Sequence, residues 1–193
     1  VQFKPIDEMA IVEVLVAEGS DPATATAVAD VAGGRLDRAR MLARDPGFAE
    51  RLQAWRSVPT RLDGTGARVV ELAEELLASI EGPLEVVRAQ QADELAALKE
   101  DAQQRGERSI PGRDAVEARH RRELRRVRTD EIRAGLAALS AVYRERLVAP
   151  EIATPRLKTT LSAMSSIDEA SSRLSRNVNE AMLLEWLLLK LDT

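Results

Sequence analysis

The chain has 193 residues, of which 45% are hydrophobic, 31% charged and 3% aromatic, and it contains no cysteine. These values predict a soluble, cytoplasmic chain of one or two domains without disulfides or thiolate metal sites, and we expect neither a membrane span nor a signal peptide. The net charge of −4 argues against a protein that coats nucleic acid, and no glycine precedes a lysine, which excludes a phosphate-binding P-loop.

The first part of the chain has the pattern of three short helices. Residues 1–5 alternate apolar and polar side chains, which is typical of a strand end or an extended lead-in, and proline at the fifth position stops further pairing. Helical spacing then predicts helices over residues 6–18, 21–32 and 36–43, separated by glycines. We expect these helices to form one compact unit, which spans residues 1–45.

Longer helices follow from Phe48. Residues 63–66 read as a turn, and a wide apolar stripe over residues 69–80 predicts a buried helix that ends at Gly82-Pro83. A second stripe covers residues 132–147. The C-terminal run at residues 182–191 is apolar on nearly all sides, so we expect it to be deeply packed or covered by a partner.

Between these stripes, over about residues 84–130, the apolar positions thin to a narrow line. The segment 106–112 contains glycines and a proline and predicts a turn, so the two flanking helices should form an antiparallel hairpin. Residues 81–107 hold seven acids and three bases, a net −4, whereas residues 111–128 hold seven arginines and three acids, a net +4. The two arms are electrostatically matched.

One basic cluster stands out in the second arm. An arginine-rich helix can follow the phosphates of a nucleic acid. It can also be a solvated face that pairs with the acidic arm, and the absence of interleaved aromatic residues favours this second interpretation. The cluster consists of Arg119, Arg121, Arg122, Arg125, Arg126 and Arg128.

His120 is the only histidine, and Glu117 and Glu123 flank it at three-residue spacing. A Glu-x-x-His pair is used in metal sites of helical bundles, but those sites need the same motif on a second helix. A catalytic triad would have to use this histidine in a solvated, thinly packed arm. We therefore expect neither a metal site nor catalysis at His120.

Several arginines follow the glycine pair at residues 33 and 34. Arg35, Arg38 and Arg40 lie at or near the start of the helix over residues 36–43. They can mark an ordinary helix boundary with a charged first turn, or they can reach an anion or a neighbouring subunit.

Three segments, taken in order, carry a resemblance. They are the lead-in at residues 1–6, the glycine-led helix at 33–40, and residues 174–180, which contain an Asn-Val-Asn run at 177–179 and lead into the leucine-rich residues 182–189. Together they resemble the delta-prime subunit family of bacterial DNA polymerase III, in its actinobacterial form with an inserted charged hairpin. The resemblance covers only the last two domains of that subunit.

The resemblance implies an all-α fold, with an AAA+ lid-like domain at residues 1–45 and a collar domain at 46–193 that carries the hairpin insert at about 84–130. Residues 1–5 would be the last strand of a preceding ATPase-like domain. The family's collar domains associate side by side in a ring of five subunits. The residues carried over as collar packing are Asn177, Asn179, Leu183, Leu184, Trp186, Leu187 and Leu188.

The glycine-led helix corresponds to the sensor-2 segment of that family. ATP-hydrolysing relatives place an arginine three residues after the glycine to contact the γ-phosphate, and here that position is Asp37. An acid repels a phosphate, so the resemblance implies no complete ATP site and no cofactor. A shift of one residue would place Arg38 there instead, beside Arg35.

The function implied is that of a non-catalytic subunit fragment of the replicative clamp loader, within the DNA polymerase III holoenzyme. Its partners would be the ATPase subunits of the gamma or tau type and the delta subunit, with the sliding clamp and DNA contacted only indirectly. The alternative is a stand-alone helical protein that binds nucleic acid through the basic helix at residues 119–128.

Overall fold

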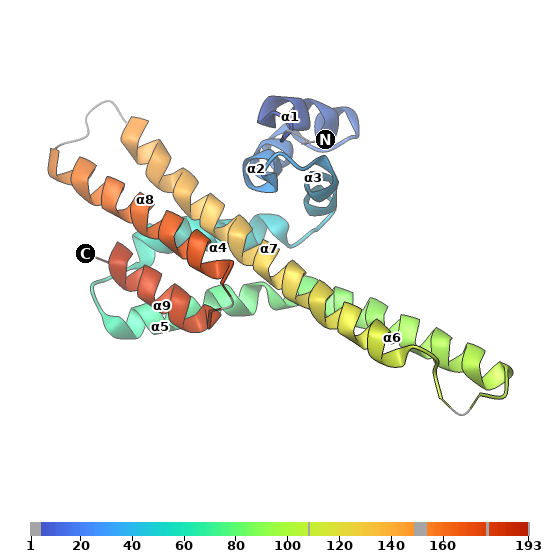
Figure 1. The fold of residues 1–193 in the computed structure, drawn as a ribbon. Coiled ribbons are helices and arrows are strands. Elements are labelled where there is room, and N and C mark those ends of the chain that lie inside the picture. The colour runs from blue at the N-terminus through green and yellow to red at the C-terminus, as the bar shows by residue number, and fades with distance from the viewer. Residues whose placement is uncertain (1–4, 108, 149–153, 177, 193) are drawn as a thin grey trace. The chain divides into compact units, whose positions relative to one another are not determined.

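The computed structural model describes residues 5–107, 109–148, 154–176 and 178–192, and every regular element in these ranges is a helix (Figure 1). The all-α prediction is confirmed. Of the strand end expected at residues 1–5, residues 1–4 lie outside the described residues. None of these helices has the length and apolar character needed to cross a membrane. The helices are α1 (Glu8–Ala17), α2 (Pro22–Ala32), α3 (Leu36–Ala43), α4 (Phe48–Arg61), α5 (Gly66–Ser79), α6 (Glu81–Gln104), α7 (Arg113–Val148), α8 (Thr154–Leu174) and α9 (Glu180–Leu191).

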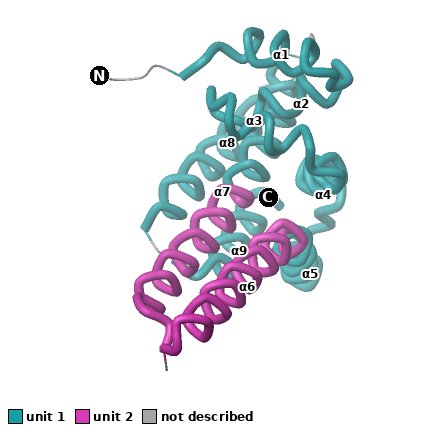
Figure 2. The backbone as a smooth tube through the Cα atoms, turned by 90° about the vertical axis from the view of Figure 1, so that its right-hand side faces the viewer, with its two compact units in different colours: residues 1–79, 133–193 teal, residues 80–132 magenta. Residues whose placement is uncertain are grey.

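The chain divides into two compact units, which Figure 2 colours separately. The first unit comprises residues 1–79 and 133–193, and the second comprises residues 80–132. Helix α7 is 36 residues long and contributes its first part to the second unit and the remainder to the first. The range predicted for the hairpin insert lies within the second unit.

Local capping explains where the first helices begin and end. The carboxylate of Asp7 accepts a hydrogen bond from the backbone N–H of Met9 at 2.9 Å, so α1 begins two residues later than predicted. Asp21 caps α2 in the same way, through the N–H of Ala23 at 3.0 Å. Helix α2 ends at Gly33, whose φ of 61° is a left-handed conformation that favours glycine.

The second glycine of the pair allows a close approach between backbone segments. A Cβ atom on Gly34 would lie 2.4 Å from Cβ of Pro5, and the Gly34 carbonyl accepts a hydrogen bond from the N–H of Ile6 at 2.9 Å. Helices α1, α2 and α3 pack on one another around a small apolar core. This core is formed by Ile11, Leu15, Ala25, Val28, Ala29, Ala39 and Leu42.

The longer helices of the first unit share a larger core. Helix α9 contacts α5 and α8, and α4 contacts α5. Helix α4 also approaches α7, because a Cβ atom on Gly135 would lie only 2.0 Å from Cε2 of the buried Trp55. The glycine in α7 therefore makes room for the largest side chain of α4. Other core residues are Leu52, Val58, Val69, Leu72, Leu76, Leu136, Leu139, Ile167, Leu184, Leu187 and Leu188.

The predicted end of the helix before the hairpin was wrong. Helix α5 ends at Ser79 and α6 begins at Glu81, so Gly82 and Pro83 lie inside the first turn of α6. Proline is tolerated there because the N–H groups of a first helical turn have no carbonyl partner within the helix.

The second unit is a helical hairpin in which α6 and the first part of α7 run antiparallel (Figures 1 and 2). The predicted turn lies between them, since α6 ends at Gln104 and α7 begins at Arg113. From Leu84 onward on α6, the buried and half-buried positions recur every three or four residues, as in a narrow coiled-coil seam. These positions are Leu84, Val87, Gln91, Leu95, Leu98 and Ala102.

Candidate interaction surfaces

The lead-in to α9 fixes where that helix starts. The side-chain oxygen of Asn179 accepts a hydrogen bond from the N–H of Met182 at 3.2 Å, which makes Asn179 the N-cap. Asn177, which was also predicted as an interface residue, lies outside the described residues. The last residue of the Asn-Val-Asn run thus has a local structural role as a helix cap.

The four predicted leucines of α9 are all buried within this chain. Leu183, Leu184, Leu187 and Leu188 recur at spacings of one, three and one, which places them on one face of the helix. Helices α5 and α8 contact α9 and cover this face. The leucines are core residues, and any surface that α9 offers to another molecule lies on its other side.

That other side carries an apolar stripe. Met182 is 67% exposed, Leu189 is 52% exposed and Trp186 is half-buried, at spacings of four and three residues. The guanidinium carbon of Arg173 lies 4.3 Å from the centroid of the Trp186 ring, a distance typical of cation–π stacking. We call Met182, Trp186 and Leu189 the α9 stripe. Of these, only Trp186 was singled out from the sequence.

Helix α8 carries a second apolar stripe. Leu161 and Leu157 are exposed and Met164 is half-buried, again at spacings of four and three residues. We call these three residues the α8 stripe. Sequence reasoning missed it, although the helical periodicity of the three side chains is the signal that could have found it.

The sensor-2-like segment places its charged groups in pairs. Nη2 of Arg35 lies 2.8 Å from Oδ2 of Asp37, and this hydrogen bond is the main cause that lowers the pKa of the Asp37 carboxyl. Arg38 is buried. Arg40 donates to Glu18 through Nε at 2.9 Å and so joins α3 to the end of α1. The exposed side chains of this segment therefore present neutralised pairs.

His120 is buried, with 6% of its surface exposed, which corrects the expectation that this histidine is solvated, although its neighbours Arg119 and Arg121 are exposed. The facing helix supplies the cover: Nε2 of His120 lies 2.7 Å from Oε2 of Glu94 on α6. Arg119 also pairs with Glu94. The hydrogen bonds from His120 and then from Arg119 lower the pKa of the Glu94 carboxyl.

Gln91 completes a polar layer in the seam of the hairpin. Its buried Nε2 donates to the backbone carbonyl of His120 at 3.2 Å and to Oε2 of Glu123 at 2.8 Å. Because these bonds form only in one alignment of the arms, the layer specifies the register of α6 against α7. This layer is structural, and no motif in the sequence indicates the roles of Gln91 and Glu94.

The arginines of the predicted basic cluster fall into three groups. Arg128 and Arg119 pair with acids of the first arm, Arg128 through Nη1 at 2.7 Å from Oε1 of Glu81. Arg126 lies 3.8 Å from Asp130 on its own helix. Within the described residues, no ion pair is formed by the remaining three, Arg121, Arg122 and Arg125, and all three are exposed.

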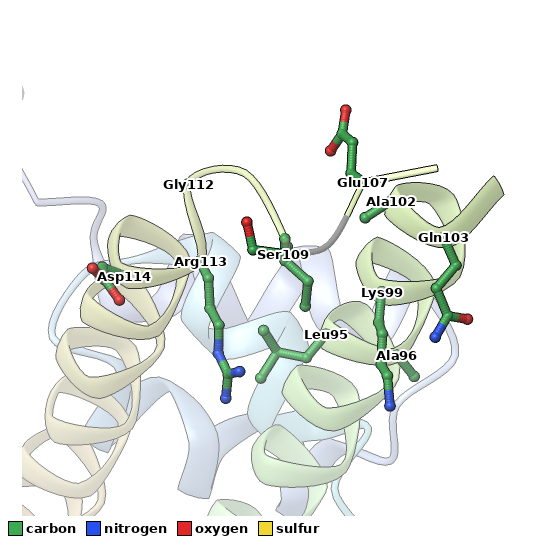
Figure 3. Close-up of a pocket in the computed structure, with 11 residues that line it drawn as sticks. Leu95, Ala96, Lys99, Ala102, Gln103, Glu107, Ser109, Gly112, Arg113 and Asp114 are labelled. Carbon is green, nitrogen blue, oxygen red and sulfur yellow. The ribbon is translucent and has the colours of Figure 1, made fainter. Parts of the chain in front are cut away.

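An open groove of about 800 Å³ lies beside the turn of the hairpin (Figure 3). Leu95 and Arg113 reach into the space between the two helices. Lys99 and Glu107 stand near its rim, and Nε of Arg113 donates to Glu117 at 2.6 Å. The charged groups among the described residues that line the groove are Lys99, Arg113, Glu107 and Asp114, two of each sign, and they indicate no particular class of ligand.

The described residues contain no group of three or more histidine, cysteine or acidic side chains that could hold a metal ion. Glu117 and Glu123, which flank His120 in the sequence, bind Arg113 and Gln91 instead.

No protein-family model, no curated protein and no solved structure matches the chain.

Proposed function

We propose that this chain is a non-catalytic assembly module of a bacterial replicative clamp loader, of the delta-prime type, which acts in the cytoplasm. Its partners are the ATPase subunits of the gamma or tau type and the delta subunit. The sliding clamp and DNA are reached through those partners. The proposal starts from the ordered resemblance of residues 1–6, 33–40 and 174–189 to that family.

The observation that carries the proposal is the α9 stripe. Met182, Trp186 and Leu189 stay at the surface, although the leucines on the opposite side of the same helix are buried in the core. An exposed apolar row on a well-packed helix is suited to binding another subunit, because that contact removes apolar area from water without reorganising the fold.

A subunit within a ring needs two different contact surfaces, since it meets one neighbour on each side. The α8 stripe offers a second apolar row, separate in sequence from the α9 stripe.

In the sensor-2-like segment the carboxylate of Asp37 pairs with Arg35, and Arg38 is buried. Both observations favour a structural role for this segment over contact with a nucleotide phosphate.

The test is co-purification of this chain with the gamma- or tau-type ATPase and delta subunits of a bacterial clamp loader. The variant Met182→Asp with Trp186→Asp should lose the partners, because two charges in a desolvated stripe are costly to bury. Met9→Asp with Met41→Asp is the matched control, since both methionines are exposed on α1 and α3. Circular dichroism should show the same helix content for all three proteins.

Assembly that survives Met182→Asp with Trp186→Asp would remove the α9 stripe from the interface. Equal loss of assembly in the α1 and α3 control would mean that added acids, and not the stripe, disrupt the complex. Failure of the unmodified chain to retain any clamp-loader subunit would overturn the proposed function.

A further inference from the structure

Four arginines in the hairpin part of α7 lie together on one side of the helix. At 100° per residue, Arg121, Arg122, Arg125 and Arg126 fall within an arc of about 140°. His120 and the other seam residues point to the opposite side, where His120 is buried. We call these four arginines the arginine stripe. All four are exposed.

The acids nearest to the arginine stripe are already engaged by other groups. Glu117 binds Arg113 at 2.6 Å, and Oε2 of Glu123 accepts a hydrogen bond from Gln91. Glu94 is held by Arg119 and His120. Within the part of the chain that the structure describes, Arg126 alone of the four forms an ion pair, with Asp130 at the long distance of 3.8 Å. The stripe therefore keeps a net positive charge after the arms have paired.

The charge density of the stripe matches that of a polyanion. A helix rises about 1.5 Å per residue, so four arginines within six residues give about one positive charge per 2 Å of axis. Duplex DNA carries about one negative charge per 1.7 Å of its axis. Guanidinium groups also bind phosphate oxygens in a bidentate geometry, which lysine does not match.

We infer that Arg121, Arg122, Arg125 and Arg126 bind the phosphate backbone of duplex nucleic acid without reading its sequence. Phe, Trp and Tyr are absent from residues 80–132, and the imidazole of His120 is buried, so the described residues of the hairpin expose no ring on which an unpaired base could stack. The stripe also contains no large apolar side chain of the kind that anchors a protein partner. This surface is distinct from the α9 and α8 stripes and adds a direct DNA contact to the proposed assembly role.

The test is fluorescence anisotropy of the full chain with a labelled DNA duplex at a series of salt concentrations. Replacing Arg121, Arg122 and Arg125 by glutamine removes three charges. The variant should bind at least about tenfold more weakly at low salt, and the slope of log K against log salt should decrease by about three. The matched control replaces Arg144, Arg156 and Lys158 by glutamine, since these residues are exposed and lie outside the hairpin.

Several results would overturn the inference. One is equal weakening in the Arg144, Arg156 and Lys158 control, which would assign the effect to net charge. Another is binding of poly-glutamate as tight as binding of the duplex, which would assign the stripe to an acidic protein. A third is no binding of the unmodified chain at low salt. Because none of the replaced arginines lies in the α9 or α8 stripe, co-purification with clamp-loader subunits is expected to be unchanged, so the two proposals can fail separately.

Discussion

The imidazole Nε2 of His120 lies 2.7 Å from Oε2 of Glu94, so a buried ring on α7 is tied to an exposed carboxylate on α6. Arg119 binds the same carboxylate. One acid of the first arm thereby holds two neighbouring residues of the second arm, and the hairpin gains a contact that depends on pH.

Replacing Glu94 by glutamine should destabilise the hairpin at neutral pH and have little effect in acid. In the folded chain the pKa of Glu94 is lowered from its usual 4.5, first by the hydrogen bond with His120. A lowered folded-state pKa means that the ionised form stabilises the fold above about pH 4.5, and that this stabilisation is lost as pH falls through the folded-state pKa. Hydrogen exchange of hairpin amides at pH 7 and at about pH 2.5 measures the difference.

The neighbouring acid supplies the control for Glu94→Gln. Asp93 is exposed, and its replacement by asparagine removes the same charge as Glu94→Gln. Among the described residues, however, Asp93 forms no contact with His120 or Arg119. Asp93→Asn should leave exchange unchanged. If Glu94→Gln reduced the protection of hairpin amides from exchange as much in acid as at neutral pH, the assigned role of the carboxylate would be contradicted.

Replacing Gly135 by alanine should destabilise the first unit. The new methyl group would lie 2.0 Å from Cε2 of Trp55, so α4 or α7 must shift. Overpacking of this kind lowers the free energy of unfolding by about 1–3 kcal/mol or more. Gly66→Ala is the control, because nothing lies within 4 Å of a Cβ atom at that position. Thermal unfolding of both variants checks the prediction, and equal melting temperatures would show that α4 is not packed against Gly135.

Removing the acid from a largely buried ion pair should destabilise the chain more than removing it from an exposed ion pair. Arg51 is 10% exposed at its side chain and lies 2.5 Å from Asp45, so Asp45→Ala leaves a covered guanidinium without that carboxylate. The free energy of unfolding should fall by about 1–3 kcal/mol. Arg105 and Asp101 form an exposed pair, so Asp101→Ala should lower the free energy of unfolding by less than about 1 kcal/mol. Urea unfolding distinguishes the two, and similar small losses would mean that burial does not strengthen the first pair.

Deleting residues 88–126 and joining the ends with a short glycine-rich linker should leave the first unit folded. That unit contains its own apolar core around Trp55, Leu72, Leu139 and Leu187. We expect one cooperative unfolding transition and unchanged co-purification with clamp-loader subunits, but no binding to duplex DNA. Loss of cooperative unfolding would show instead that the hairpin is required for the main core.

Much of the helical pattern could be predicted because its signals are local. Asp21 followed by proline, and the glycine at residue 33, define both ends of α2 through caps that involve only neighbouring residues. The turn between α6 and α7 follows from the glycines and proline in residues 106–112. The break before α6 was placed three residues too late, because proline fits the first turn of a helix as well as it ends one.

The sequence by itself determined an all-α chain with charge-matched hairpin arms, since periodicity and charge are properties of consecutive residues. Only the tertiary structure decided which side chains were covered. It buried His120 against Glu94, turned Leu187 inward and Met182 outward on the same helix, and paired Arg128 with Glu81 while leaving Arg121 exposed. Those outcomes depend on residues tens of positions away, and the register that brings them together is set by packing and buried hydrogen bonds between the arms.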